Sequence, residues 1–142
     1  MSRKDLFHEE FKEALIADGW EITDDPLVIT FKDDRKVKID LGAERILGAQ
    51  KDNEQIAVEI KTFLSQSFVN ELHRAVGQFI NYRIAIKLKD PGRVLFLAIP
   101  EPTWQADFQY DFFRLLINEA KINIVTYDPS DKSIVQWIKY ER

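Results

Sequence analysis

The sequence predicts a mixed α/β fold (α+β mixed sheet), with the element order αβββαβ followed by αββ. Three observations support it. Residues 55–63 alternate between apolar and polar, as in a half-buried strand. Residues 94–99 are apolar without alternation, which is typical of a strand covered on both faces. Three segments with helical spacing lie between the extended ones, so we expect helices packed on a sheet.

The amino-terminal half begins with a helix that we expect to end at Gly19, since glycine commonly terminates helices. Its apolar positions recur at helical spacing: Phe7, Phe11, Ala14 and Leu15. Short extended segments follow at 20–23 and 27–31. A polar turn at 33–36 then predicts a hairpin into an alternating strand at 37–41. A further strand is expected at 45–49, before the strand at 55–63.

In the carboxy-terminal half, Ser67 is placed to cap a helix over 68–87, which the sequence Asp90-Pro91-Gly92 interrupts. A third helix is expected over 103–120, followed by strands at 122–127 and 133–140. The third helix is unusually aromatic. We expect most of its aromatic side chains to pack in the core, and any exposed remainder is a candidate protein interface: Trp104, Phe108, Phe112 and Phe113.

Composition limits the possible functions. The 142 residues suit one domain, 1–142, with 45% hydrophobic residues to build its core. The net charge of −4 disfavours a function in which the whole protein surface binds nucleic acid electrostatically. The chain contains no cysteine, so thiolate metal sites, disulfides and cysteine nucleophiles are excluded. No apolar run approaches the roughly 18 residues of a membrane span, and we expect a cytoplasmic protein without membrane contact.

One pair of residues carries the chemical prediction. Glu59 and Lys61 are two apart on a predicted strand, so both side chains leave the same face about 6.7 Å apart along the strand. The two other Glu-x-Lys sequences fall on predicted helices, where such residues diverge. Asp40 ends a strand that we expect to neighbour Glu59. Two such carboxylates suit Mg²⁺ or Mn²⁺, and Lys61 can then orient water or stabilise charge on a phosphoryl group.

The pattern of a helix, three strands, an Asp and then Glu-x-Lys resembles the restriction-endonuclease-like core of the PD-(D/E)XK nucleases. The resemblance implies that Asp40 and Glu59 hold the metal and that Lys61 assists the hydrolytic water. Glu9 resembles an additional metal-binding acid of resolvase-like members, with Glu10 and Glu13 as competitors. Gln78 resembles a helical glutamine of the site. The sequence departs from the pattern at Ile39, where many members have proline.

A closer resemblance, to the XisH family, extends over almost the whole chain. It is carried by ordered segments: 4–8, 14–20, 25–27, 39–44, 56–61, 77–83 and 135–138. Those proteins are cyanobacterial fdxN element excision controlling factors. The resemblance implies DNA as a partner, together with a site-specific recombinase and an XisI-like companion. It fits Mg²⁺-dependent hydrolysis of a DNA phosphodiester, or a non-catalytic regulatory or assembly role. By analogy with nucleases of this shape, we expect a homodimer.

Structural roles for the same residues are alternatives to these functional ones. Asp40, Glu59 and Lys61 also fit a structural ion-pair cluster. Two basic groups can either track a phosphate backbone or form solvated faces. The first is Lys32, Arg35, Lys36 and Lys38; the second is Arg83, Lys87, Lys89 and Arg93. We expect the two histidines, His8 and His73, to be surface or interface residues.

Overall fold

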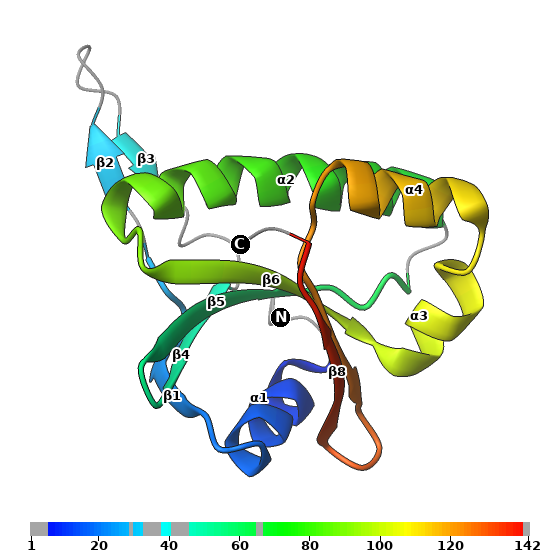
Figure 1. Ribbon diagram of the computed structural model, residues 1–142, viewed down its shortest axis with the longest axis horizontal. Helices are drawn as coiled ribbons and strands as arrows, with labels where there is room; N and C mark the ends of the chain where they lie inside the picture. The colour runs from blue at the N-terminus through cyan, green and yellow to red at the C-terminus, as the bar shows by residue number, and fades with distance from the viewer. Residues whose placement is uncertain (1–5, 29, 33–37, 41–45, 65–66, 141–142) are drawn as a thin grey trace.

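The computed structural model describes residues 6–28, 30–32, 38–40, 46–64 and 67–140. It confirms the mixed α/β prediction: a six-stranded mixed sheet carries helices on both faces (Figure 1). None of its helices is long and apolar enough to cross a membrane. The elements are α1 (His8–Ala17), β1 (Glu21–Asp24), β2 (Thr30–Lys32), β3 (Lys38–Asp40), β4 (Ile46–Lys51), β5 (Glu54–Ile60), α2 (Phe68–Lys89), β6 (Arg93–Pro100), α3 (Glu101–Asp107), α4 (Asp111–Glu119), β7 (Ile124–Asp128) and β8 (Ser133–Ile138).

The sheet has the strand order β1-β4-β5-β6-β7-β8. β5 and β6 are parallel, as are β6 and β7, and the other neighbours are antiparallel. β6 is buried from Leu95 to Pro100, as its continuous apolar run predicts. The parallel pairs need crossover connections, which α2 provides between β5 and β6, and α3 with α4 between β6 and β7.

The alternation of β5 divides the core between the two faces of the sheet. Ile56, Val58 and Ile60 pack on the face covered by α1, whereas Ala57 packs on the face covered by α2, α3 and α4. This confirms the division of β5 predicted from its alternation. Glu59 has the same parity as Ala57, so its side chain leaves the sheet on the α2 face.

One expectation about the sheet is wrong. β3, which ends at Asp40, pairs with β2 in a separate two-stranded sheet, with Asp40 opposite Thr30. The neighbours of β5 are instead β4 and β6. Period-two alternation in 37–41 predicted a strand but carried no information about its partner, because alternation does not encode strand order. The predicted turn at 33–36 lies outside the described residues.

The expectation of one helix over 103–120 is also wrong, because the helix is broken at Phe108. α3 ends there, and α4 begins after Tyr110, whose backbone is extended. Side chains stabilise the break: Gln109 Nε2 donates to the Trp104 carbonyl at 2.9 Å, and Arg114 Nε donates to the Phe108 carbonyl at 2.8 Å. The Trp104 carbonyl also accepts the last helical N–H, from Phe108 at 3.3 Å, whereas the Phe108 carbonyl accepts from the Arg114 side chain. In contrast, the predicted Ser67 cap is confirmed, accepting from the Asn70 N–H.

Candidate active site

The Glu59 carboxylate lies in an apolar environment on the α2 face of the sheet. In the register, Glu59 stands opposite Ile46 of β4 and Leu97 of β6, and both neighbours are fully buried in the core on that face. Glu59 itself is 1% exposed. A carboxylate is rarely buried this deeply without compensating charges or a functional reason.

Lys61 supplies a compensating charge. Its Nζ lies 3.7 Å from Glu59 Oε2, and its side chain is 19% exposed. The structure therefore brings together the Glu-x-Lys pair that the sequence singled out. Glu59 is almost fully enclosed while the Lys61 side chain is partly exposed, so the pair places two ionisable groups at the border between the protein interior and solvent. Electrostatic interactions with a ligand are stronger there than in water.

The backbone after Lys61 is held firmly in place. The Lys61 N–H donates to the Ala98 carbonyl at 3.1 Å, which extends the β5–β6 pairing beyond Ile60. Phe63 adopts a left-handed φ of 58°, an unfavourable conformation for a bulky residue. Its buried ring packs against Phe68 and Phe108, with ring centroids 5.6 and 5.4 Å away. This aromatic cluster holds the turn that follows the candidate site.

The structure places the other predicted site residues on different elements. Gln78 lies on α2, the helix that covers the face carrying Glu59, and its Oε1 is buried. Asp40 ends β3, and its side chain lies outside the described residues. Its strand is not beside β5, although only residues 41–45 separate it from Ile46, the residue opposite Glu59. Roles for Asp40 and Gln78 stay predictions.

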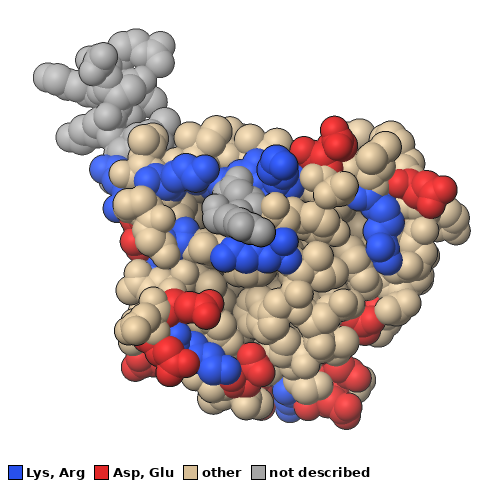
Figure 2. Space-filling model, in the orientation of Figure 1, with Lys and Arg blue, Asp and Glu red and all other residues tan. Residues whose placement is uncertain are grey.

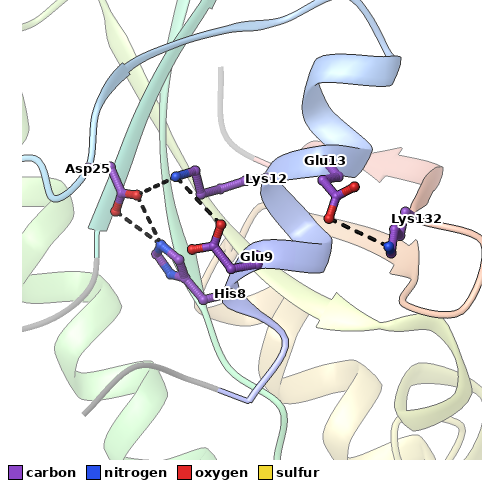
Figure 3. A network of polar contacts seen from close by, with 6 residues as sticks. All are labelled: His8, Glu9, Lys12, Glu13, Asp25 and Lys132. Atoms are coloured by element: carbon purple, nitrogen blue, oxygen red, sulfur yellow. Dashed lines mark hydrogen bonds and ion pairs between the residues drawn. The ribbon is translucent and has the colours of Figure 1, made fainter. Parts of the chain in front are cut away.

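Glu9 belongs to a polar cluster on the opposite face, around α1 (Figure 3). His8 is 1% exposed and its Nε2 donates to both Asp25 carboxylate oxygens, at 3.0 and 3.2 Å. Lys12 Nζ donates to Asp25 at 2.7 Å and lies 3.9 Å from Glu9. The expectation that His8 is a surface or interface residue is therefore wrong as to its exposure. His8 is buried because its side chain pairs with the carboxylate of Asp25, which lies 17 residues further along the chain. His73 is exposed.

This cluster contains a second set of metal-type ligands. Potential ligand atoms of His8, Glu9 and Asp25 lie within 4.8 Å of one another. However, the Lys12 ammonium already provides a cation at Asp25. The structure thus places Glu9 with His8 and Asp25, while its proposed role beside Glu59 stays a prediction.

The cluster predicts a pH dependence of stability. Burial alone raises the pKa of Asp25, but hydrogen bonds from Lys12 and His8 outweigh it and hold that pKa below its ordinary value of 3.8. The hydrogen bond to Asp25 raises the pKa of Lys12 above 10.5. The stabilisation from Asp25 is therefore complete above pH 3.8 and disappears as pH falls through the lower folded pKa. Lys12 makes the mirror-image contribution, which is lost as pH rises through its raised pKa.

We expect Asp25→Ala to lower the free energy of unfolding by about 1–3 kcal/mol at neutral pH, because it leaves the buried His8 Nε2 without its acceptor. Urea unfolding of the wild type and Asp25→Ala from about pH 3 to pH 7 measures the difference. The difference should shrink toward the acid end. A constant difference would show that the carboxylate charge is not what stabilises the cluster.

A groove of about 610 Å³ lies away from the Glu59–Lys61 pair. It opens at the start of β5, beside Gln55 and Ile56, whereas Glu59 and Lys61 lie at its end. Its aromatic wall is continuous: Trp137 lies 5.5 Å from Trp20 and 5.0 Å from Phe96, measured between ring centroids. Sequence patterns could not predict this groove, because its wall joins segments far apart in the chain.

The basic residues around the end of α2 divide into two kinds. Arg83 donates to the carbonyls of Lys121 and Ala120 at 2.7 and 3.2 Å, so it caps the end of α4. Arg93 donates to the Ile56 carbonyl and to Asp90, both at 2.9 Å. These two arginines have structural roles, while Lys87 and Lys89 are exposed.

Figure 2 shows basic side chains gathered over the α2 half of the face in view, and acidic ones mostly over the α1 half. Of the first basic group, only Lys32 and Lys38 have a described backbone.

Known proteins share both the sequence and the fold of this chain. A family model described as XisH protein matches residues 1–135. The chain belongs to the XisH family. A crystal structure of an XisH family protein from Nostoc punctiforme PCC 73102 has a TM-score of 0.86 and 42% identity, covering 95% of this chain and 100% of that chain. No curated protein matches the chain.

A second XisH relative of solved structure is the fdxN element excision controlling factor of Anabaena variabilis. It has a TM-score of 0.86 and 43% identity, and the match covers 96% of this chain and 100% of that chain. The resemblance inferred from short ordered segments is therefore confirmed at the level of the family.

Proposed function

We propose that this XisH protein acts as an excision controlling factor that binds DNA and hydrolyses a phosphodiester at a Mg²⁺ or Mn²⁺ site containing Glu59. One observation carries the proposal: a carboxylate that is 1% exposed lies 3.7 Å from the Nζ of a lysine that reaches solvent. Stability alone does not explain a buried ion pair, because apolar residues of similar volume often give the same or greater stability at such a position. Its placement at the end of a central strand suits a site.

The donor chemistry fits the metal. Glu59 supplies hard carboxylate oxygens, and Asp40 would supply a second set, the ligand type that Mg²⁺ and Mn²⁺ prefer. The bound ion would provide positive charge at the phosphate and lower the pKa of a water molecule. Lys61 would orient that water and stabilise the charge that develops on the phosphoryl oxygens. The water oxygen would bond to phosphorus as the water loses a proton to solvent, and the bond to the leaving sugar oxygen would break, with that oxygen taking up a proton from solvent.

Cleavage assays test the proposal. The full chain is incubated with double-stranded, single-stranded and branched DNA, with Mg²⁺, with Mn²⁺ and with chelator. We expect metal-dependent cleavage, lowered about 10²-fold or more by Lys61→Ala. Lys132→Ala is the matched control, because Lys132 also pairs with a carboxylate, Glu13 at 3.6 Å, but is far more exposed. Cleavage that Lys61→Ala leaves unchanged would contradict the proposal, as would the absence of cleavage with every substrate.

Metal removal should also weaken DNA binding. The chain carries a net charge of −4, and without a metal ion the carboxylates of the proposed site add to the negative charge that a phosphate meets. Adding Ca²⁺, which supports binding without promoting hydrolysis, is expected to strengthen affinity for DNA about tenfold or more over chelator at constant ionic strength. Fluorescence anisotropy measures this change. Equal affinities in both conditions would mean that no metal couples the protein to DNA.

A second candidate is a non-catalytic assembly role, with an XisI-like companion or a recombinase as partner. The separation of β3 from β5 favours it, since the described strands beside Glu59 bring no second carboxylate to it. Full excision activity of an Asp40→Ala/Glu59→Ala double variant would select this role. Loss of excision with the partner complex intact would exclude it.

A further inference from the structure

The groove at the start of β5 lies on the α1 face of the sheet. Its floor is formed by Ile56 of β5 and by Val94 and Phe96 of β6, and all three contribute to the core on that face. The strand order places the β4–β5 turn on one side of this floor and the end of β8 on the other. With a volume of about 610 Å³, the groove falls in the range of about 300–1,000 Å³ that is usual for pockets that bind small ligands.

Trp137 gives the groove an aromatic surface. Its ring is partly exposed and packs against Trp20 and Phe96, which are only 8% and 6% exposed. Trp20 is itself fixed, because its Nε1 donates to the Asp18 carboxylate at 3.1 Å. The Trp137 ring is therefore held from two sides. A ring held in this way can stack on a flat ligand at little cost in conformational entropy.

Most of the charges that line the groove are balanced within the chain. Lys51 Nζ donates to the Asp18 carbonyl at 2.7 Å. Glu54 stands directly opposite Lys51 in the β4–β5 register, so these two opposite charges are neighbours. The side chains of Asp52 and Lys139 are exposed and make no ion pair with another described residue. The groove thus has an available carboxylate at the β4–β5 turn and an available ammonium after β8.

A nucleotide has the complementary arrangement of groups. A base with an exocyclic amino group offers N–H donors to a carboxylate, as N4 of cytosine does. The ring of the base can stack on an aromatic side chain, and the phosphate can pair with a lysine. A ligand that is only cationic would leave Lys139 without a partner, whereas a ligand that is only anionic would meet the carboxylate of Asp52.

We propose that the groove binds a nucleotide whose base carries an exocyclic amino group. The base stacks on Trp137, its amino group donates to Asp52, and its phosphate pairs with Lys139. The ligand is a free nucleotide or an unpaired nucleotide of a DNA strand. This site is separate from Glu59 and Lys61, which lie at the other end of β5. Binding is measured with chelator present, so the nucleotide site and the proposed hydrolysis can fail independently.

Tryptophan fluorescence of the full chain, titrated with dCMP, tests the site. We expect saturable quenching as the base stacks on Trp137. The dissociation constant should be about tenfold or more higher for dUMP, which lacks the amino group, and for deoxycytidine, which lacks the phosphate. The absence of saturable quenching by dCMP up to about 10 mM would overturn the proposal. Quenching by N-acetylarginine amide but not by dCMP would show that the groove binds a cation, and the nucleotide would be wrong.

Two exposed residues permit variants that leave the core intact. Lys139→Ala should raise the dissociation constant of dCMP about tenfold and leave that of deoxycytidine unchanged. Asp52→Asn should reduce the preference for dCMP over dUMP to about twofold or less. The matched controls are Lys132→Ala and Asp131→Asn, which change an exposed lysine just before β8 and an exposed aspartate of the β7–β8 turn, both outside the groove. If Lys139→Ala and Asp52→Asn bind like these controls, the proposal is wrong.

A single-stranded oligonucleotide of deoxycytidine distinguishes the two sources of the ligand. Tighter binding per nucleotide than that of dCMP would assign the groove to an unpaired nucleotide of a DNA strand. Equal or weaker binding would assign it to a free nucleotide. In both cases Lys139→Ala should weaken the binding, and an oligonucleotide affinity that this variant leaves unchanged would place the strand elsewhere on the protein.

Discussion

Replacing Glu59 with glutamine is expected to lower the rate of metal-dependent DNA hydrolysis by about 10³-fold, the largest functional effect of any single substitution in this chain. The amide keeps the size of the side chain but has no negative charge to hold a divalent cation. Glu59 is 1% exposed between Ile46 and Leu97, so bulk solvent does little to compensate for the lost charge. The rate is measured under single-turnover conditions with the DNA form that the wild type cleaves best.

The matched control is Glu54→Gln. Glu54 is also a carboxylate of β5, but it lies at the opposite end of the strand and is exposed. Its replacement should leave the rate within a factor of about two, as expected for an exposed charge remote from the site. Unchanged cooperative unfolding of Glu59→Gln would confirm that the lost rate is not lost folding. A Glu59→Gln variant that cleaves DNA like the wild type would eliminate Glu59 from catalysis.

The second large effect is on stability. Phe108 is fully buried, and its ring centroid lies 5.2 to 5.4 Å from those of Phe63, Phe68 and Trp104. Phe108→Ala removes all three contacts and leaves a cavity where α3 ends. We expect the free energy of unfolding to fall by about 3–5 kcal/mol, as for other buried aromatic truncations. Guanidinium unfolding followed by far-UV circular dichroism measures the change.

Ile16→Ala is the control for this truncation, since Ile16 is 56% exposed and should change the stability by about 0.5 kcal/mol or less. Phe108→Ala should also affect the candidate site, because Phe63 loses a ring that fixes the turn after Lys61. At temperatures where the variant is folded, its cleavage rate should be reduced. A stability loss no larger than that of Ile16→Ala would mean that the aromatic cluster does not hold this part of the fold.

The central strands could be predicted because the local pattern of apolar residues indicates which of their residues are buried. The alternation of Ile56, Val58 and Ile60 with Ala57 and Glu59 placed each residue on the correct face of β5. The uninterrupted apolar run of residues 94–99 likewise predicted β6, which helices cover on both faces. Ser67 marked the start of α2 because a cap is a local interaction.

Interactions between distant segments could not be predicted in the same way. Spacing suggested one helix across 103–120, but bonds from Gln109 and Arg114 stabilise a break at Phe108. Alternation predicted the strand of Asp40 without indicating that β2 would be its partner. The burial of His8 depends on Asp25, which a different element supplies. In each case the deciding contact is tertiary, so the sequence pattern alone leaves it open.

The candidate site was predictable in part for the same reason. Glu59 and Lys61 are held together by the two-residue repeat of a single strand, and the structure places them 3.7 Å apart. Neither the depth at which Glu59 is buried nor the clamp formed by Phe63 is visible in the motif. The exposed Phe112 does agree with the expectation that any aromatic left outside the core of the third predicted helix marks a candidate interface.

Metal binding at Glu59 is tested most directly by soaking a crystal of this protein in Mn²⁺ and recording diffraction at a wavelength where manganese scatters anomalously. We expect an anomalous peak about 2.1 Å from carboxylate oxygens of Glu59 and Asp40, absent from crystals of Glu59→Gln. A peak at His8, Glu9 and Asp25 with none at Glu59 would contradict this expectation, and so would the absence of any peak at Glu59 at saturating Mn²⁺.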